Sequence, residues 1–332
     1  MKDMNIKDEE VLDKELGLLL ESMPEQENFE KKIDKYIKKK IQKITVRTVL
    51  SLLLVIAVLF LLISPVMNAI YFNPEKLQKD GTLLSVFRDY CEVSRPQKEV
   101  ISIDVKSKGF SRYKMSMEVH DHTAPLIVGR ENVWVDVFAG KYQDWQDSEM
   151  MLTPQLGMFD HPVTQEEIDS MIGDFKKLPE SAKISLAIWD KEVRDVEELR
   201  KENVSLDWIE VYHPNQPEFQ GGLNLWMNQI VKETDDREEM TEKELLDLYV
   251  AKLKNLVEHG EVWRSMGLPY HSTVFADGEE QMKACYEDAK TLTKLQTKGY
   301  YISGSRDEII SYLQKTGIES VSVYDVNSSI WE

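Results

Sequence analysis

The chain has 332 residues, 42% of them hydrophobic, which suffices for a folded core and excludes wholesale disorder. Its formal net charge is −18, and this excess belongs to residues 71–332, because an acidic block at residues 1–30 (−7) cancels a basic block at residues 31–47 (+7). Because an acidic body is repelled by phosphates, we exclude direct binding to nucleic acid. Cys91 and Cys285 belong to no C-x-x-C or Cys/His cluster, so they either form a disulfide or remain separate buried thiols.

The first predicted element is an amphipathic helix over residues 8–23, with Asp8 as its N-cap and Pro24 as its stop. One face carries apolar side chains at helical spacing: Leu12, Leu16, Leu19, Leu20 and Met23. A single helix this short cannot bury its own apolar face. The leucines therefore either contact a partner protein or fold back on the next helix.

A second predicted helix runs from about Gln26 into an apolar segment. It keeps isoleucines and aromatic residues at helical spacing, and lysines fill the other positions. The bulk of this stretch is interpreted as a basic stem that lies against anionic lipid headgroups.

Residues 48–70 are predicted to form a transmembrane helix. No charged residue occurs between Thr48 and Pro74, and the helix would be about 34 Å long, enough to cross a hydrocarbon core of roughly 30 Å. A cleavable signal peptide is disfavoured because a long charged region precedes the apolar core. The basic residues before the span predict a cytoplasmic N-terminus and an extracellular C-terminal region.

The region after the span is predicted to be α+β. Residues 98–145 resemble three strands of a β-meander beside the membrane, and residues 164–177 a helix capped by Thr164 and Glu167. Two strand–helix–strand units follow, at residues 183–213 and 299–326. Each second strand is expected to return beside its first, in an α/β sandwich of ferredoxin-like type.

The stretch between these units, residues 215–298, is predicted to be largely helical, with helices over residues 241–260 and 278–299 that end at glycines. The predicted domains are a cytoplasmic arm (1–47), the transmembrane helix (48–70), a membrane-proximal β-rich region (71–160) and a C-terminal α/β domain (161–332).

The chain contains no phosphate-binding glycine loop, nucleophile elbow or H-E-x-x-H motif. His120 and His122 would share one face of a strand, but two ligands do not make a metal site. Tryptophans such as Trp134 and Trp208 are interpreted as core residues or pocket-lining residues. We therefore predict no catalytic, cofactor-binding or metal-binding residues and no enzymatic activity.

The layout resembles the sigma factor regulator (anti-sigma factor) family of Gram-positive bacteria, in which a cytoplasmic arm, a membrane helix and an extracytoplasmic domain follow in that order. The resemblance rests on the lysine-rich run into the span (Lys38–Leu59) and on two C-terminal stretches (Lys183–Tyr212 and Tyr300–Gln314). Ser185, Trp208 and Gly304 would occupy family positions. The arm lacks the His and Cys residues of the zinc-binding members, so that version is excluded.

The resemblance implies that the arm holds an extracytoplasmic-function sigma factor at the membrane while the external domain reports envelope state. Leu12, Leu16, Leu19 and Leu20 would then contact the sigma factor, as a helix laid in a groove. The arm could also assist other membrane regulators. The competing hypothesis is a membrane-anchored surface enzyme or a cell-wall or ligand-binding module, and a third is an assembly factor for another envelope protein.

Overall fold

The structure is a computed structural model. It describes residues 18, 26–96, 98–123, 126–146, 162–216, 219, 221–225, 229–231, 237–264, 279–315 and 317–328. The predicted contact residues Leu12, Leu16, Leu19 and Leu20 lie outside this part, as does the predicted domain boundary at residue 160. The chain divides into two units, residues 1–63 and 64–332, and each is described by itself.

The first unit contains a long helix, α2 (Gln26–Val58), followed by a π-helical turn, η1 (Leu59–Ile63). Within the described residues, one helix, Ile33–Ile70, is long and apolar enough by length and composition to cross a membrane. The large apolar side chains of residues 49–63 are 37–73% exposed. The π-turn precedes Pro65, which has no N–H to donate to the Leu61 carbonyl, and the wider turn accommodates its ring.

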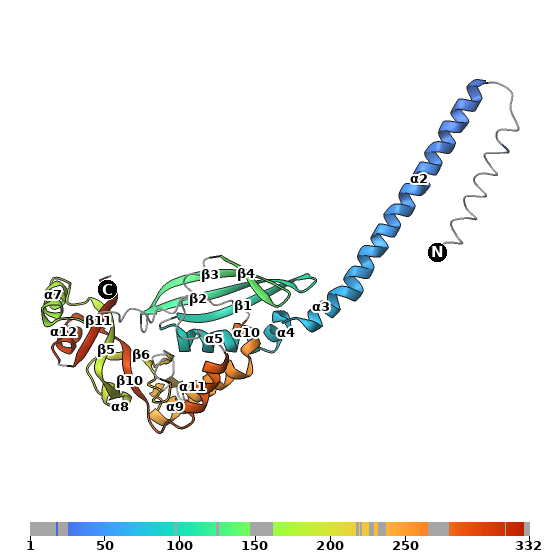
Figure 1. The fold of residues 1–332 in the computed structure, drawn as a ribbon. Helices are drawn as coiled ribbons and strands as arrows, with labels where there is room; N and C mark the ends of the chain where they lie inside the picture. Colours follow the sequence, from blue (N-terminus) through green and yellow to red (C-terminus); the bar gives the residue numbers. More distant parts are fainter. Residues whose placement is uncertain are drawn as a thin grey trace. The chain divides into compact units, whose positions relative to one another are not determined.

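The second unit begins with three short helices, α3 (Ser64–Ile70), α4 (Pro74–Lys79) and α5 (Thr82–Ser94). Asn73 caps α4 by accepting a hydrogen bond from the Lys76 N–H, and Pro74 occupies the first turn, where no N–H is needed. The apolar face of α5 is completely buried and includes Leu83, Val86 and Phe87. Because α5 contacts β1, β7 and α9, it joins the two larger sheets of this unit (Figure 1).

The first sheet is an antiparallel meander in the order β1-β2-β3-β4, so it has four strands where the sequence predicts three. Its strands are β1 (Lys98–Gly109), β2 (Arg112–Thr123), β3 (Leu126–Phe138) and β4 (Lys141–Gln146). Side chains alternate along β2, so that Met115 and Met117 are buried while Lys114 is exposed. One face of the meander packs on the core and the other faces solvent.

The second sheet is antiparallel, in the order β11-β5-β10-β6-β7. Its strands are β5 (Lys183–Asp195), β6 (Ser205–Glu210), β7 (Gly222–Asn224), β10 (Gln296–Ser305) and β11 (Ile318–Asn327). The two strand–helix–strand units are present, with α8 (Val196–Leu199) and α12 (Arg306–Leu313) as their helices.

The expectation that each unit's second strand lies beside its first is wrong. β10 lies between β5 and β6, and β5 lies between β10 and β11, so each unit inserts a strand into the other. Numbered by their order in the chain, these four strands lie across the sheet as 4-1-3-2, which is the arrangement of a split β-α-β fold. Neighbouring strands can then all be antiparallel although each crossover joins two parallel strands.

The other described helices of the second unit are α7 (Gln165–Phe175), α9 (Glu242–Glu258), α10 (Gly260–Arg264) and α11 (Glu279–Ala289). The capping box predicted at Thr164 and Glu167 is present, and Thr241 with Glu244 forms another on α9. Three short strands, β7, β8 (Gln229–Val231) and β9 (Arg237–Glu239), lie in the stretch predicted to be largely helical, so that prediction is wrong in part.

The helix predicted over residues 278–299 ends ten residues early, at Ala289, and Gly299 lies inside β10. Gly299 pairs with Trp189 of β5, and a β-carbon there would lie 2.4 Å from the Trp189 ring. The glycine therefore makes room for a tryptophan and does not end a helix. The mixed α+β class is confirmed, with one long apolar helix and two larger antiparallel sheets.

Candidate functional site

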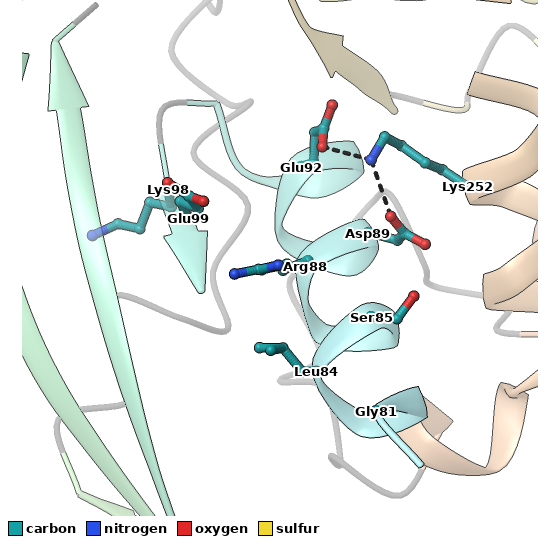
Figure 2. Close-up of a pocket in the computed structure, with 9 residues that line it drawn as sticks. All are labelled: Gly81, Leu84, Ser85, Arg88, Asp89, Glu92, Lys98, Glu99 and Lys252. Atoms are coloured by element: carbon teal, nitrogen blue, oxygen red, sulfur yellow. Dashed lines mark hydrogen bonds and ion pairs between the residues drawn. The ribbon is translucent and has the colours of Figure 1, made fainter. Parts of the chain in front are cut away.

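A polar cleft of about 340 Å³ is the candidate site in the second unit. Figure 2 shows it on α5, with β1 on one side and α9 on the other. Charged side chains of both signs dominate its wall, which comprises Gly81, Leu84, Ser85, Arg88, Asp89, Glu92, Lys98, Glu99 and Lys252.

The α9 side of the cleft is held by a three-residue ion cluster. Lys252 Nζ lies 3.0 Å from Asp89 Oδ1 and 2.8 Å from Glu92 Oε2, and all three side chains are at most 13% exposed. Burial lowers the pKa of Lys252, but Glu92 and then Asp89 outweigh this effect, so its pKa is raised above the ordinary value. Asn255 donates hydrogen bonds of 2.6 Å to Asp89 Oδ2 and 3.0 Å to Ser85 Oγ.

The β1 side of the cleft is held by Arg88, which donates to the carbonyl oxygens of Val100 and Ile101 at 2.8 and 3.2 Å. These carbonyls lie at a break in the β1–β2 register between Val100 and Ser102. A β-bulge of this kind leaves backbone groups unpaired within the sheet, and the guanidinium satisfies them. Arg88 therefore fixes the position of α5 relative to the bulge.

A second group of charges on β1 and β2 includes both histidines considered as metal ligands. His122 Nε2 lies 3.2 Å from Glu99 Oε2, and His120 Nε2 lies 2.9 Å from Glu118 Oε1. The ring centroids are 6.2 Å apart, so both histidines share one region of the sheet, as their spacing predicts. Each nevertheless contacts its own carboxylate, and the described residues contain no group of three or more His, Cys, Asp or Glu side chains that could hold a metal ion.

A third polar cluster is buried beside the second sheet. His213 is 1% exposed; its Nδ1 lies 3.0 Å from Asp288 Oδ2 and its Nε2 2.9 Å from Tyr249 Oη. Burial lowers the pKa of His213 more than the hydrogen bond and charge of Asp288 raise it, so the neutral imidazole is favoured. Burial also raises the pKa of the Glu210 carboxyl to about 8.

Both cysteines are free and buried. The alternative of two separate thiols is therefore the one observed. Burial raises the pKa of the Cys91 thiol to about 11, and burial together with the charge of Asp288 raises that of Cys285 to about 12. A nucleophilic cysteine needs a depressed pKa and access to substrate, so neither thiol is activated.

The charged groups of the cleft wall are engaged within the protein: Lys252 pairs with Asp89 and Glu92, and Arg88 donates to backbone carbonyls. Sequence reasoning missed the cleft because Asp89 and Lys252 are far apart in the chain. The available signal was the polar series Ser85, Asp89 and Glu92, which runs at helical spacing along an otherwise apolar helix. We compared the chain with protein-family models, curated proteins and solved structures, and none of them matches it.

Proposed function

We propose that the protein is a single-pass, membrane-bound regulator of the anti-sigma type. Residues 1–45 would hold an extracytoplasmic-function sigma factor in the cytoplasm, and residues 71–332 would report the state of the envelope from outside. The observation that carries the proposal is the helix Ile33–Ile70, whose long apolar side chains are exposed along its length. Exposed aliphatic side chains on all faces of a helix are stable in lipid and costly in water.

The charge pattern supports the proposed orientation. Eight Lys and Arg residues occur between residues 31 and 47, directly before the apolar stretch, which favours a cytoplasmic N-terminus under the positive-inside tendency. The acidic C-terminal unit is large and has a continuous buried core, as expected of a folded external domain. A regulator of this kind needs a folded domain on one side of the membrane and a short partner-binding arm on the other.

Capture of the sigma factor tests the arm. The full-length chain, solubilised in mild detergent from its native membrane, is expected to co-purify with a sigma factor, and Leu16→Asp is expected to abolish this recovery. Glu15→Gln, beside Leu16 but outside the predicted leucine face, serves as the matched control. Recovery of no sigma factor with either the native chain or the control would refute the proposal.

The cleft of the second unit supports a second candidate, an anchored ligand-binding module. The observation that supports this candidate is the pairing of Lys252 with Asp89 and Glu92 at the wall of the cleft of about 340 Å³. Deletion of residues 2–30 separates the two candidates. If the protein is a sigma regulator, this deletion should raise expression of the genes that the sigma factor controls. If the protein is a ligand-binding module, it should keep its function.

A further inference from the structure

We propose that the solvent-exposed face of the meander lies on the surface of an anionic lipid bilayer. The inference rests on the membrane anchoring described under the proposed function. It concerns the end of the sheet that carries the β1–β2 and β3–β4 turns. We call this surface the cationic face; it comprises Lys106, Lys108, Arg112, Lys114, Trp134, Phe138 and Lys141.

The position of the sheet in the chain is the first argument. The Phe110 N–H donates to Ser64 Oγ at 2.9 Å, and the Ser111 N–H donates to Asn68 Oδ1 at 2.8 Å. Ser64 and Asn68 belong to α3, the last turns of the apolar helix Ile33–Ile70. In the other turn, Gly140 approaches Phe72, just after α3. Both turns are therefore held against residues 64–72, at the C-terminal end of the proposed span.

Charge is the second argument. The second unit is strongly acidic overall, yet this part of the sheet carries five Lys or Arg side chains against Asp104 and Asp136. Asp136 pairs with Lys108 at 3.1 Å, and Asp104 lies 3.6 Å from Lys106. The register places Lys106 directly opposite Lys114, a like-charge pair that is unfavourable in water and favourable against phosphate headgroups.

The aromatic residues are the third argument. Trp134 is 39% and Phe138 is 36% exposed. Lys114 Nζ lies 4.7 Å from the Trp134 ring centroid, and Arg112 Cζ lies 4.9 Å from that of Phe138. Tryptophan beside basic residues is typical of surfaces at the headgroup level of a membrane, because the ring is amphipathic. The combination favours anionic phospholipid over zwitterionic lipid.

A fluorescence-quenching experiment tests the inference. Gln143→Cys places a single reactive thiol on this face of β4, since Gln143 pairs with Asp136 and both native cysteines are buried. The full-length chain, labelled with a fluorophore there, is reconstituted into vesicles with nitroxide-labelled headgroups. We expect strong quenching with phosphatidylglycerol, weak quenching with phosphatidylcholine or at high salt, and little from a label at the exposed position Glu197→Cys.

The decisive variant combines Lys106→Gln, Arg112→Gln and Lys114→Gln. Each basic residue near an anionic surface contributes roughly a fivefold factor, so this variant should lower the docked-to-free ratio by roughly 100-fold. The matched control removes three exposed lysines elsewhere, through Lys176→Gln, Lys201→Gln and Lys254→Gln, and should keep the quenching. Unchanged near-ultraviolet circular dichroism establishes that both variants are folded.

Several outcomes would overturn the inference. Equal quenching in the two lipids, or an equal loss of quenching in the two triple variants, would show that the cationic face does not bind anionic lipid. Displacement by soluble poly(glycerol phosphate), with binding of that polymer by the chain, would assign the face to a wall polymer. A chain that floats with vesicles without quenching refutes only the docking, whereas a chain that fails to float refutes the anchoring itself.

Discussion

The two larger sheets of the second unit use the same antiparallel pairing but bury different numbers of faces. In the meander, alternate residues are exposed, and Trp134 lies on the open face. In the second sheet, residues 184–188 of β5 are all buried, so both faces of this interior strand are covered. This difference indicates that the second sheet contributes more buried apolar surface to the stability of the fold, while the meander leaves one face exposed that can contact another surface.

The largest effect is expected at Trp208 in β6. This side chain is fully buried, donates a 3.0 Å hydrogen bond to the Glu92 carbonyl and packs edge-on against Tyr301. Trp208→Ala should lower the free energy of unfolding by about 3–5 kcal/mol, because a large cavity is left in a core covered on both faces. Urea denaturation of the full-length chain in detergent measures it. A loss below about 1 kcal/mol would contradict the two-sided burial of this sheet.

The next effect tests the link between α5 and α9, which lie beside the sheets. Lys252→Met leaves the Asp89 and Glu92 carboxylates without their cation and should cost about 2–4 kcal/mol near neutral pH. Lys254→Met, two residues away and half exposed beside Glu258, should cost less than about 0.5 kcal/mol. Equal losses in the two variants would show that the ion cluster adds no stability.

A smaller, pH-dependent effect is expected at Glu210, at the end of β6. Burial raises its folded-state pKa from 4.5 to about 8, so the folded chain binds more protons than the unfolded chain between these values. This contribution to stability is therefore complete below about pH 4.5 and is lost as the pH rises to about 8. Glu210→Gln should gain about 1–3 kcal/mol over the native chain between pH 5 and pH 8.5.

Denaturation curves at those two pH values measure this change. The measurement at the lower pH serves as the control. There Glu210 of the native chain is protonated, and a protonated carboxyl resembles the amide of the variant in size and polarity. A difference between the two proteins that is independent of pH would contradict the assignment.

The smallest effect is expected at Trp134. It is the same residue type as Trp208 but lies on the open face of the meander, so Trp134→Ala in detergent should change the free energy of unfolding by less than about 1 kcal/mol. Thermal unfolding of the two alanine variants side by side makes the comparison direct. A loss at Trp134 as large as that at Trp208 would show that the open face is packed against another part of the chain.

Much of the local structure follows from the sequence, because local signals determine it. The apolar helix, the meander strands and the capping boxes at Thr164 and Thr241 depend on residues within a few positions of each other. The interleaving of β5, β6, β10 and β11 depends on pairing across a long separation, which periodicity does not encode. The cleft could not be predicted for the same reason, because Asp89 and Lys252 come together only after α5 and α9 pack against each other.

Residues 278–299 show how a glycine can mislead. The sequence pattern predicts that Gly299 ends a helix, but in the structure Gly299 makes room for the Trp189 ring of the paired strand β5, a contact that no local pattern predicts. The leucines of the arm remain a prediction.

The interleaved strands also determine how much of the chain must be synthesised before the second sheet can form. β5 ends at Asp195, yet both of its neighbours come later, because β10 begins at Gln296 and β11 ends at Asn327. β5 therefore leaves the ribosome with both edges unpaired, and its second edge stays unpaired until β11 has been made. If the chain crosses the membrane as proposed, residues 71–332 must pass through as an unfolded polypeptide and close this sheet on the far side. A ribosome that stopped before β11 would leave a strand edge exposed to other chains.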